Sequence, residues 1–514
     1  MEENYQMDKL IEKKEKTITL CWIMIISGFF VVLFSLSTSP ILSKYFCYDS
    51  AIFQVVGKAW ANGIIPYSNC FDHKGPLLFL INAIGYKMGI GKAGVCFVQW
   101  IFMSVSFFVL YLAARIYLNR LTASLVVLAS YFILSITYGQ GNLSEEYSLI
   151  FIISSIYLGM KYIKSVEEKG IVNHPFRYAI WYGVSFTSIL FLRVTNGVAI
   201  CCLIFVICIL LIKDKKFVNL LQNACAFLAG ACIVFIPFSV YYYLKNSWYD
   251  MIFGTIIYNV LYASESVMVL DKSVLVGLFS SFFLIIVSVL HIICTNKTKD
   301  ILGMYSFFTA TLSLIMFTQM NGYGHYYMIT LPYFMISVIF IKDIYNSKIK
   351  SKIIKRCLVC GLGCFVFIQM GLAGYKTVRQ IKEHQINKNY QKEYLEFCKY
   401  FNDYIPNEEK ENVLTFGRNS LSSWYLVNDV NPPYKYCFVQ DWQAKNSEEM
   451  TKEILAHLNG NPEKWLITNA DYDTKEILMS YNQEFKNIII DKYDYIDSYT
   501  VKQNFETYNL YKLK

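Results

Sequence analysis

Long apolar runs separated by short polar segments dominate the first 375 residues of the chain. The first run extends from about residue 18 to residue 36, and further runs begin near residues 93, 121, 147, 178, 198, 220, 273, 301, 326 and 357. A run of about 20 apolar residues crosses a bilayer as a helix. The pattern therefore predicts about eleven spanning helices, the pair flanking Arg193 being short. Because no small-residue cleavage site follows the first run, it indicates a retained helix rather than a cleaved signal peptide.

Two regions depart from this pattern. The loop at residues 40–92 contains two apolar pieces, 51–61 and 76–88, which are too short to span and are expected to lie at the membrane interface or on the bundle. The segment 376–514 has the composition of a soluble domain. Its patterns predict a helix at 448–458, strands at 413–416, 436–439, 465–468 and 488–490, and a Tyr-rich strand region at the end. We expect a small α/β domain, in which no glycine-rich nucleotide-binding motif occurs.

The distribution of positive charge predicts the orientation in the membrane. Lys and Arg gather in alternate loops, at residues 9–16, 115–120, 161–177, 213–216, 297–299 and 342–356, and such loops lie in the cytoplasm. The loop at 40–92, with five lysines, is the exception. We therefore predict a multi-pass plasma-membrane protein with a cytoplasmic segment 1–17, a transmembrane domain 18–375 with its first outer loop at 40–92, and an extracytoplasmic α/β domain 376–514.

Composition supports the membrane assignment and excludes one class of partner. Hydrophobic residues make up 55% of the chain and charged residues 17%, compared with about 25% charged residues in soluble domains. The net charge of +9 does not indicate a nucleic-acid-binding protein, because no basic stretch alternates with stacking aromatics. Most of the 15 cysteines lie within apolar runs, where the Cys357-x-x-Cys360 spacing indicates packing rather than redox chemistry. Four do not, namely Cys47, Cys70, Cys398 and Cys437, and a Cys47–Cys70 bridge remains open.

The first outer loop carries the densest group of ionisable residues. Asp49 follows the first helix, and residues 72–76 read Asp-His-Lys-Gly-Pro. Ionisable groups at a membrane boundary are costly, so they indicate function. Asp49 would serve as a general base and Lys74 as a phosphate-binding cation. The alternative is that Asp49 caps a helix and Lys74 extends its ammonium to the interface.

Three further outer turns carry candidate residues. Adjacent acids at 145–146 either stabilise a helix start or bind an acceptor, a cation or a metal. An Arg at the membrane boundary either reaches the interface or meets a phosphate. A lone His is either structural or a donor to phosphate. The residues are Glu145, Glu146, Arg193, Asn196, His325 and Tyr326. Because the topology places all of them on the outer side, they suit an anionic, lipid-carried substrate.

Together these residues resemble the membrane glycosyltransferases of the GT-C type, which use polyprenyl-phosphate sugars. The resemblance covers roughly residues 18–345 and is nearest to the protein O-mannosyltransferases, the aminoarabinose transferases of lipid A and the bacterial dolichyl-phosphate-mannose-protein mannosyltransferase-like group. It rests on the acid at Asp49, on Gly63-x-x-Pro-Tyr67, on the segment 72–76, on Arg193-x-x-Asn196 and on the late His325-Tyr326. The sequence departs from the family at Ser50, where the mannosyltransferases have a second acid, and at Gly75, which replaces a proline.

The resemblance implies a GT-C-like helix bundle and an inverting hexosyl- or pentosyltransferase. A sugar on an undecaprenyl-phosphate-like carrier would pass to an envelope glycan, lipid or protein acceptor in the outer leaflet. Asp49 would be the base, and Lys74, Arg193, His325 and Tyr326 would bind the donor phosphate. The residues that would position the acceptor, or a divalent metal ion as a possible cofactor, are Asp72, His73, Glu145, Glu146 and Asn196.

Three other functions remain as alternatives. A transporter or flippase of lipid-linked glycans needs polar residues across the bilayer midplane, whereas the candidate residues gather at one face. A polysaccharide polymerase or ligase typically has a large outer loop rich in Arg and His, and the loop near residues 244–271 is small and poor in both. A non-catalytic assembly protein would use the segment 376–514 to bind partners.

Overall fold

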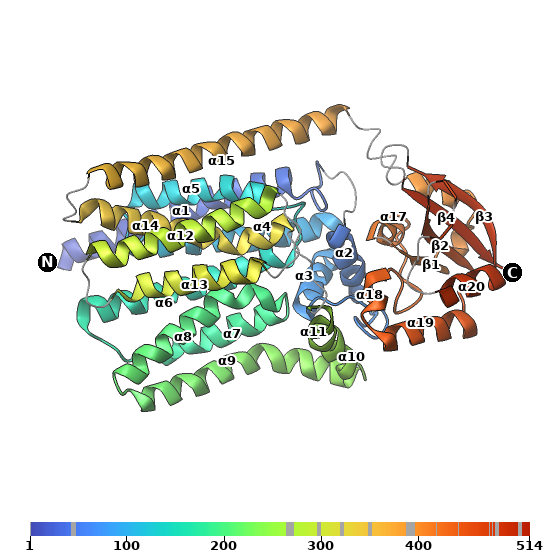
Figure 1. Ribbon diagram of the computed structural model, residues 1–514, viewed down its shortest axis with the longest axis horizontal. Helices are drawn as coiled ribbons and strands as arrows, with labels where there is room; N and C mark the ends of the chain where they lie inside the picture. Colours follow the sequence, from blue (N-terminus) through green and yellow to red (C-terminus); the bar gives the residue numbers. More distant parts are fainter. Residues whose placement is uncertain are drawn as a thin grey trace.

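The computed structural model describes all residues except 1, 43–47, 264–271, 296–299, 319–322, 348–351, 387–395, 418, 440, 472, 475, 478–482 and 502–505. A bundle of long helices has the N-terminus at one end and a small mixed domain beyond the other end (Figure 1). Short helices lie between the bundle and this domain. The end of the bundle nearest the domain is called the outer end below.

The bundle confirms the mostly helical fold expected from the apolar runs. Ten of its helical segments are long and apolar enough to cross a membrane, counted over the described residues. The 15-residue α7 is shorter and lies in the bundle beside them (Figure 1). The helices are α1 (Glu2–Phe34), α4 (Lys92–Ala114), α5 (Arg120–Thr137), α6 (Ser144–Lys169), α7 (Phe176–Leu190), α8 (Val198–Lys213), α9 (Phe217–Leu244), α12 (Lys272–Thr295), α13 (Ile301–Thr318), α14 (Leu331–Asn346) and α15 (Lys352–Ile386). Because α15 continues to Ile386, the domain boundary expected after residue 375 falls inside this helix.

Short helices cover the outer end, where the apolar pieces of the first outer loop were expected. They are α2 (Tyr48–Ala61), α3 (Pro76–Lys87), α10 (Trp248–Ile252), the π-helical turn η2 (Phe253–Ile257) and α11 (Tyr258–Ala263). With 14 and 12 residues, α2 and α3 are too short to span, and they pack on each other. Pro76 begins α3, because a proline at the first helical position needs no amide donor there. Two 3₁₀ turns precede bundle helices at this end, η1 (Val194–Gly197) before α8 and η3 (Gly324–Thr330) before α14.

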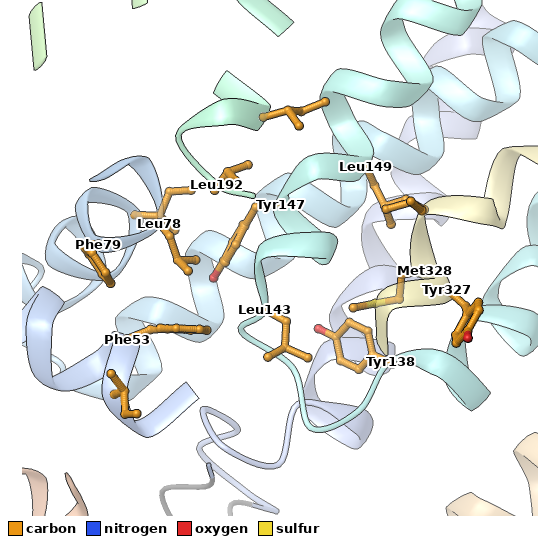
Figure 2. Close-up of a cluster of buried hydrophobic side chains, with 14 of the residues drawn as sticks. Phe53, Leu78, Phe79, Tyr138, Leu143, Tyr147, Leu149, Leu192, Tyr327 and Met328 are labelled. Carbon is orange, nitrogen blue, oxygen red and sulfur yellow. The ribbon is translucent and has the colours of Figure 1, made fainter. Parts of the chain in front are cut away.

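Buried apolar side chains connect these outer helices to the bundle. Figure 2 shows Phe53 of α2 and Leu78 and Phe79 of α3 near Tyr147 and Leu192, with Tyr138 and Met328 close by. All seven side chains are at most 2% exposed. The outer helices are therefore part of one continuous core, and they hold the first outer loop in a fixed position on the bundle.

The C-terminal domain has a four-stranded sheet in the order β1-β2-β4-β3. The strands are β1 (Val413–Phe416), β2 (Trp465–Ala470), β3 (Tyr493–Thr500) and β4 (Thr507–Leu513), and the helices are η4 (Asn407–Glu409), η5 (Asn419–Ser422), α17 (Ser423–Val427), α18 (Asp441–Lys445), α19 (Glu448–Gly460) and α20 (Gln483–Lys492). β1 and β2 are parallel, with Val413 opposite Trp465, and the other two pairs are antiparallel. Both β1, at the edge of the sheet, and β2 are buried throughout, as is typical of parallel strands that are covered on both faces.

Two of the expected strands are wrong. Residues 488–490 lie in helix α20, where Phe485, Ile488 and Ile489 form a buried stripe and Ile490 is exposed. The three consecutive isoleucines favour a strand locally, but Ile488 and Ile489 follow Phe485 by three and four residues, which is a helical spacing. Residues 436–439 form a buried turn and not a strand, because Tyr436 packs on Phe71 of the first outer loop.

Candidate active site

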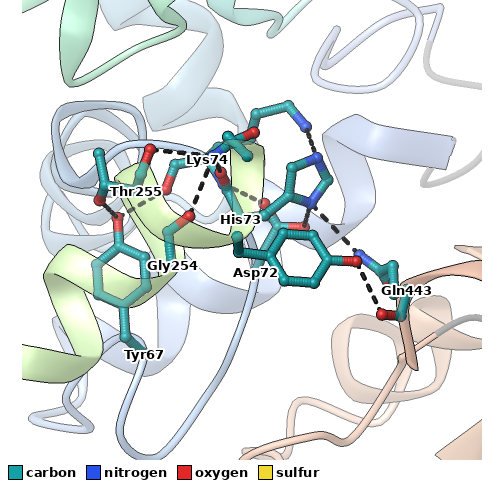
Figure 3. A network of polar contacts seen from close by, with 9 residues as sticks. Tyr67, Asp72, His73, Lys74, Gly254, Thr255 and Gln443 are labelled. Atoms are coloured by element: carbon teal, nitrogen blue, oxygen red, sulfur yellow. Dashed lines mark hydrogen bonds and ion pairs between the residues drawn. The ribbon is translucent and has the colours of Figure 1, made fainter. Parts of the chain in front are cut away.

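The segment 72–76 forms a compact turn between α2 and α3 (Figure 3). The Lys74 ammonium donates to Nε2 of His73 at 2.6 Å, and the Lys74 amide donates to Oδ1 of Asp72 at 3.0 Å. Nδ1 of the same ring lies 3.6 Å from Oδ2 of Asp72 and 3.4 Å from Nε2 of Gln443 in α18. The C-terminal domain thus reaches the residues of the first outer loop.

Tyr67 fixes the backbone of this turn. Its side chain is fully buried, and its hydroxyl donates to the Lys74 carbonyl at 2.6 Å. Its φ of 70° is unusual for a bulky residue and costs on the order of 1–3 kcal/mol. Thr255 of η2 donates to the same hydroxyl, and Asn259 of α11 donates to the His73 carbonyl at 2.7 Å. Tyr67, supported by Thr255, and Asn259 therefore hold the backbone of residues 73–74.

Gly75 brings the turn against the bundle. A Cβ at this position would lie 2.2 Å from the backbone of Phe191, so no larger residue fits unless one backbone moves. The amide of Leu77 donates to the Phe191 carbonyl at 3.1 Å. The resembled family has proline at this position. Glycine here allows the turn that contains Lys74 to pack against the backbone of Phe191, two residues before Arg193.

Arg193 lies at the end of α7 and joins three elements. Its Nη1 donates to Oε1 of Glu145 at 2.6 Å, and its guanidinium lies 3.6 Å from the centre of the Tyr326 ring. The Glu145 side chain is 1% exposed and that of Arg193 is 16% exposed. Asn196 donates to Oγ of Ser148 at 2.9 Å, which fixes η1 on α6. The guanidinium is therefore held by a carboxylate and an aromatic face at once.

His325 connects the bundle residues with the first outer loop. Its ring lies 4.6 Å from that of Tyr326. It also interacts electrostatically with four charged groups, Glu145, Asp49, Arg193 and Lys74. Tyr326 likewise interacts with Arg193, Glu145 and Asp49. Asp49 stands in the first turn of α2 and also acts on Asp72. The structure thus brings together the charged groups of four segments that are far apart in the sequence.

Glu146 points away from Glu145 into a separate polar network. Its carboxylate accepts from Gln99 at 2.9 Å, from the Tyr138 hydroxyl at 2.5 Å and from the amide of Asn142 at 2.9 Å. Asn142, which has a φ of 58°, donates to Ser50 beside Asp49 at 3.0 Å. Through Asn142, the Glu146 carboxylate therefore anchors the loop before α6 to the start of α2.

The candidate residues do not form a metal site in the described part of the chain. No group of three or more His, Cys, Asp or Glu side chains there is arranged to hold an ion. Glu145 is neutralised by Arg193, and Glu146 is satisfied by neutral donors. The two adjacent acids are therefore paired with protein groups, and the divalent ion stays a prediction.

A family model shows to which proteins the chain is related. The model with the description "Putative competence-induced protein Ccs4 N-terminal domain" matches residues 9–367. The chain belongs to this family. The match covers the helix bundle and every candidate residue, and it ends before the C-terminal domain. The Ccs4 description names no reaction, and no curated protein matches the sequence.

Solved structures similar to this Ccs4-family chain include oligosaccharyltransferases of Archaeoglobus fulgidus. One, tethered to an acceptor peptide, has a TM-score of 0.48 and 11% identity over 95% of this chain and 74% of that chain. A complex with Zn and sulfate has a TM-score of 0.45 and 10% identity over 87% and 68%. The archaeal AglB in complex with an inhibitory peptide and a dolichol-phosphate has a TM-score of 0.44 and 11% identity over 88% and 69%.

Sequence reasoning missed three residues that hold the site of this Ccs4-family protein together. Tyr67 was noted only as part of a motif, and Asn259 and Gln443 were not noted at all. Asn259 interrupts an otherwise apolar stretch, which is a weak signal in the sequence. No local pattern marks Gln443, because its role depends on a contact with a residue 370 positions away.

We predict that Tyr67→Phe reduces activity while keeping the fold. The change removes the hydrogen bond to the Lys74 carbonyl and retains the packed ring. A hydrogen bond of this kind contributes about 1 kcal/mol, so activity should fall about 5- to 10-fold. The transfer assay proposed below and thermal melting measure the two effects. Tyr242→Phe is the control, because the buried Tyr242 hydroxyl has no hydrogen-bond partner among the described residues and its ring packs on Tyr67. Equal losses in both variants would contradict the assigned contact.

Acid pH is predicted to loosen this site through His73. Burial lowers the pKa of His73 well below its ordinary value, and the charges of Lys74 and Arg193 lower it further. The unfolded chain therefore binds a proton below about pH 6.5 that the folded protein does not bind, so stability falls as pH falls. Asp72, whose pKa is raised mainly by burial, contributes in the opposite direction.

The comparison of wild type with His73→Gln isolates the histidine contribution. Melting temperatures should fall between about pH 7.5 and pH 5.5 in the wild type, and less steeply in the variant. Parallel curves would show that His73 has the same pKa in the folded and the unfolded protein, and would contradict this prediction.

Proposed function

We propose that this protein is a membrane glycosyltransferase of the GT-C type that uses a polyprenyl-phosphate sugar. The observation that carries the proposal is the grouping of Asp49, Lys74, Arg193 and His325 at the outer end of the bundle. Three basic groups and one carboxylate there suit a phosphate leaving group beside a hydroxyl nucleophile. The resemblance of the motifs at 49, 63–67 and 72–76 to that family supports the same reaction.

The proposed reaction is a single inverting displacement. Asp49 takes the proton of an acceptor hydroxyl while the hydroxyl oxygen attacks the anomeric carbon of the sugar. The bond from that carbon to the phosphate oxygen breaks, and the lipid phosphate leaves with the bonding electrons. Lys74, Arg193 and His325 bind this phosphate, and Tyr326 supports the guanidinium. Glu145 orients Arg193, whereas Asp72 and His73 orient Lys74.

We place the acceptor beside Asp49 and not beside Glu146 or Asn196. Glu146 and Asn196 each bond to neighbouring bundle residues, so we assign them to holding the loops that carry the site. The transfer assay distinguishes an envelope glycan, a lipid and a protein as the acceptor.

Transfer from a defined donor tests the proposal. The full-length protein in proteoliposomes would receive radiolabelled hexosyl or pentosyl polyprenyl phosphates together with a cell-envelope extract. Label should move to the extract with wild type and not with Lys74→Ala. Movement of intact labelled lipid between leaflets without transfer would indicate a flippase, and joining of preformed glycan chains would indicate a polymerase or ligase. Either result would overturn the proposal.

A further inference from the structure

Two cysteines from distant parts of the chain meet at the outer end. Cys70 lies in the first outer loop, two residues before Asp72, and Cys437 lies in the C-terminal domain. They are 1% and 0% exposed, both are free thiols in the structure, and their side chains lie within hydrogen-bonding range of each other. Most of the other cysteines lie in the apolar runs of the bundle.

Backbone contacts on both sides hold the two thiols next to each other. The amide of Phe71 donates to the Lys435 carbonyl at 2.7 Å, and the rings of Phe71 and Tyr436 lie 5.3 Å apart. The amide of Tyr67 donates to the Cys70 carbonyl at 2.8 Å. On the other side, the Cys437 carbonyl accepts from Thr415 at 2.5 Å and from the Tyr425 hydroxyl at 3.2 Å. Phe71, next to Cys70, is thus paired with Lys435 and Tyr436, next to Cys437, and these contacts keep the two cysteines close together.

We propose that Cys70 and Cys437 form a disulfide that ties the C-terminal domain to the first outer loop. The oxidant is a disulfide of the extracytoplasmic space, either a small molecule or a thiol–disulfide exchange protein. The two thiols lose two protons and two electrons, one S–S bond forms, and the oxidant's disulfide is reduced to two thiols. The predicted orientation places both residues outside the cytoplasm, where disulfides persist.

The bond would act on the site through neighbouring contacts. Gln443 of the C-terminal domain lies 3.4 Å from His73, and the Tyr258 hydroxyl donates to the Gln443 carbonyl at 2.9 Å. Lys58 of α2 also donates to the carbonyls of Tyr425 and Val430. These contacts between the domain and the outer helices are noncovalent. A covalent bond from Cys70 to Cys437 would keep the domain, and with it Gln443, beside the Lys74 turn.

Mass spectrometry of the full-length protein tests the bond directly. Membranes would be quenched in acid, their free thiols blocked during denaturation, and the protein digested with and without reductant. A peptide pair linking Cys70 and Cys437 is expected without reductant and should disappear with it. The pair should be lost in Cys70→Ser and Cys437→Ser. It should persist in Cys398→Ser, which removes another fully buried thiol of the same domain.

A stability measurement provides the second readout. Reductant should lower the melting temperature of wild type and of Cys398→Ser and leave that of Cys70→Ser unchanged. Recovery of both thiols in blocked form, even after membranes are incubated with oxidised glutathione, would overturn the proposal. So would a Cys70 peptide linked to Cys47. Neither readout depends on sugar transfer, so this proposal and the proposed function fail separately.

Discussion

Asp49→Asn is expected to abolish nearly all sugar transfer while leaving the protein folded. The amide cannot accept the proton of the attacking hydroxyl, and loss of a general base typically costs about 10²–10⁴-fold in rate. The amide retains the size of the carboxylate, so the first turn of α2 should persist. Initial rates at saturating donor, compared with wild type at equal amounts of membrane protein, measure the loss. The effect should fall on kcat, since other residues are proposed to bind the donor phosphate.

A carboxylate outside the site provides the control. Asp403→Asn changes an exposed acid of the C-terminal domain and should leave the rate within twofold of wild type. If Asp49→Asn retained full transfer at normal expression, another group would be the base. Asp72 would be the next candidate, because it lies within electrostatic range of Asp49 and burial raises its pKa.

The helical fold could be predicted because the signal that produces it is local. An apolar run of sufficient length must form a helix in a bilayer, since no water satisfies its backbone groups. The outer helices α2 and α3 follow from the same reasoning, as apolar pieces too short to cross. The strand prediction at 488–490 failed because three β-branched residues obscured a helical spacing that needs a longer window.

The predicted topology was enough to place the candidate residues on one side of the membrane. It could not predict which of them contact one another. Adjacent residues on a helix point about 100° apart. Glu145 and Glu146 therefore diverge, one to Arg193 and the other to Gln99 and Tyr138. The sequence presents them as a pair, and only the packing of α4 and α7 on α6 assigns them different partners. The contact of Gln443 with His73 could not be predicted either, because no sequence pattern near Gln443 indicates it.

Arg193→Met is expected to cause the largest loss of stability among these variants. The change leaves the Glu145 carboxylate, which is 1% exposed, without its ion-pair partner. Breaking one side of a buried pair costs about 3–5 kcal/mol. The melting temperature of the purified protein in detergent should therefore drop well below that of wild type. The matched control is Asp429→Asn, which breaks the Lys58 ion pair at a carboxylate that is 89% exposed, where such pairs contribute about 1 kcal/mol or less.

The double variant separates the structural from the catalytic role of Arg193. Glu145→Gln added to Arg193→Met removes the orphaned charge, so a large part of the lost stability should return. Transfer should not return with it, because the guanidinium proposed to bind the donor phosphate is still missing. If the double variant recovered both stability and transfer, Arg193 would serve only to neutralise Glu145. The phosphate would then be bound by Lys74 and His325 alone.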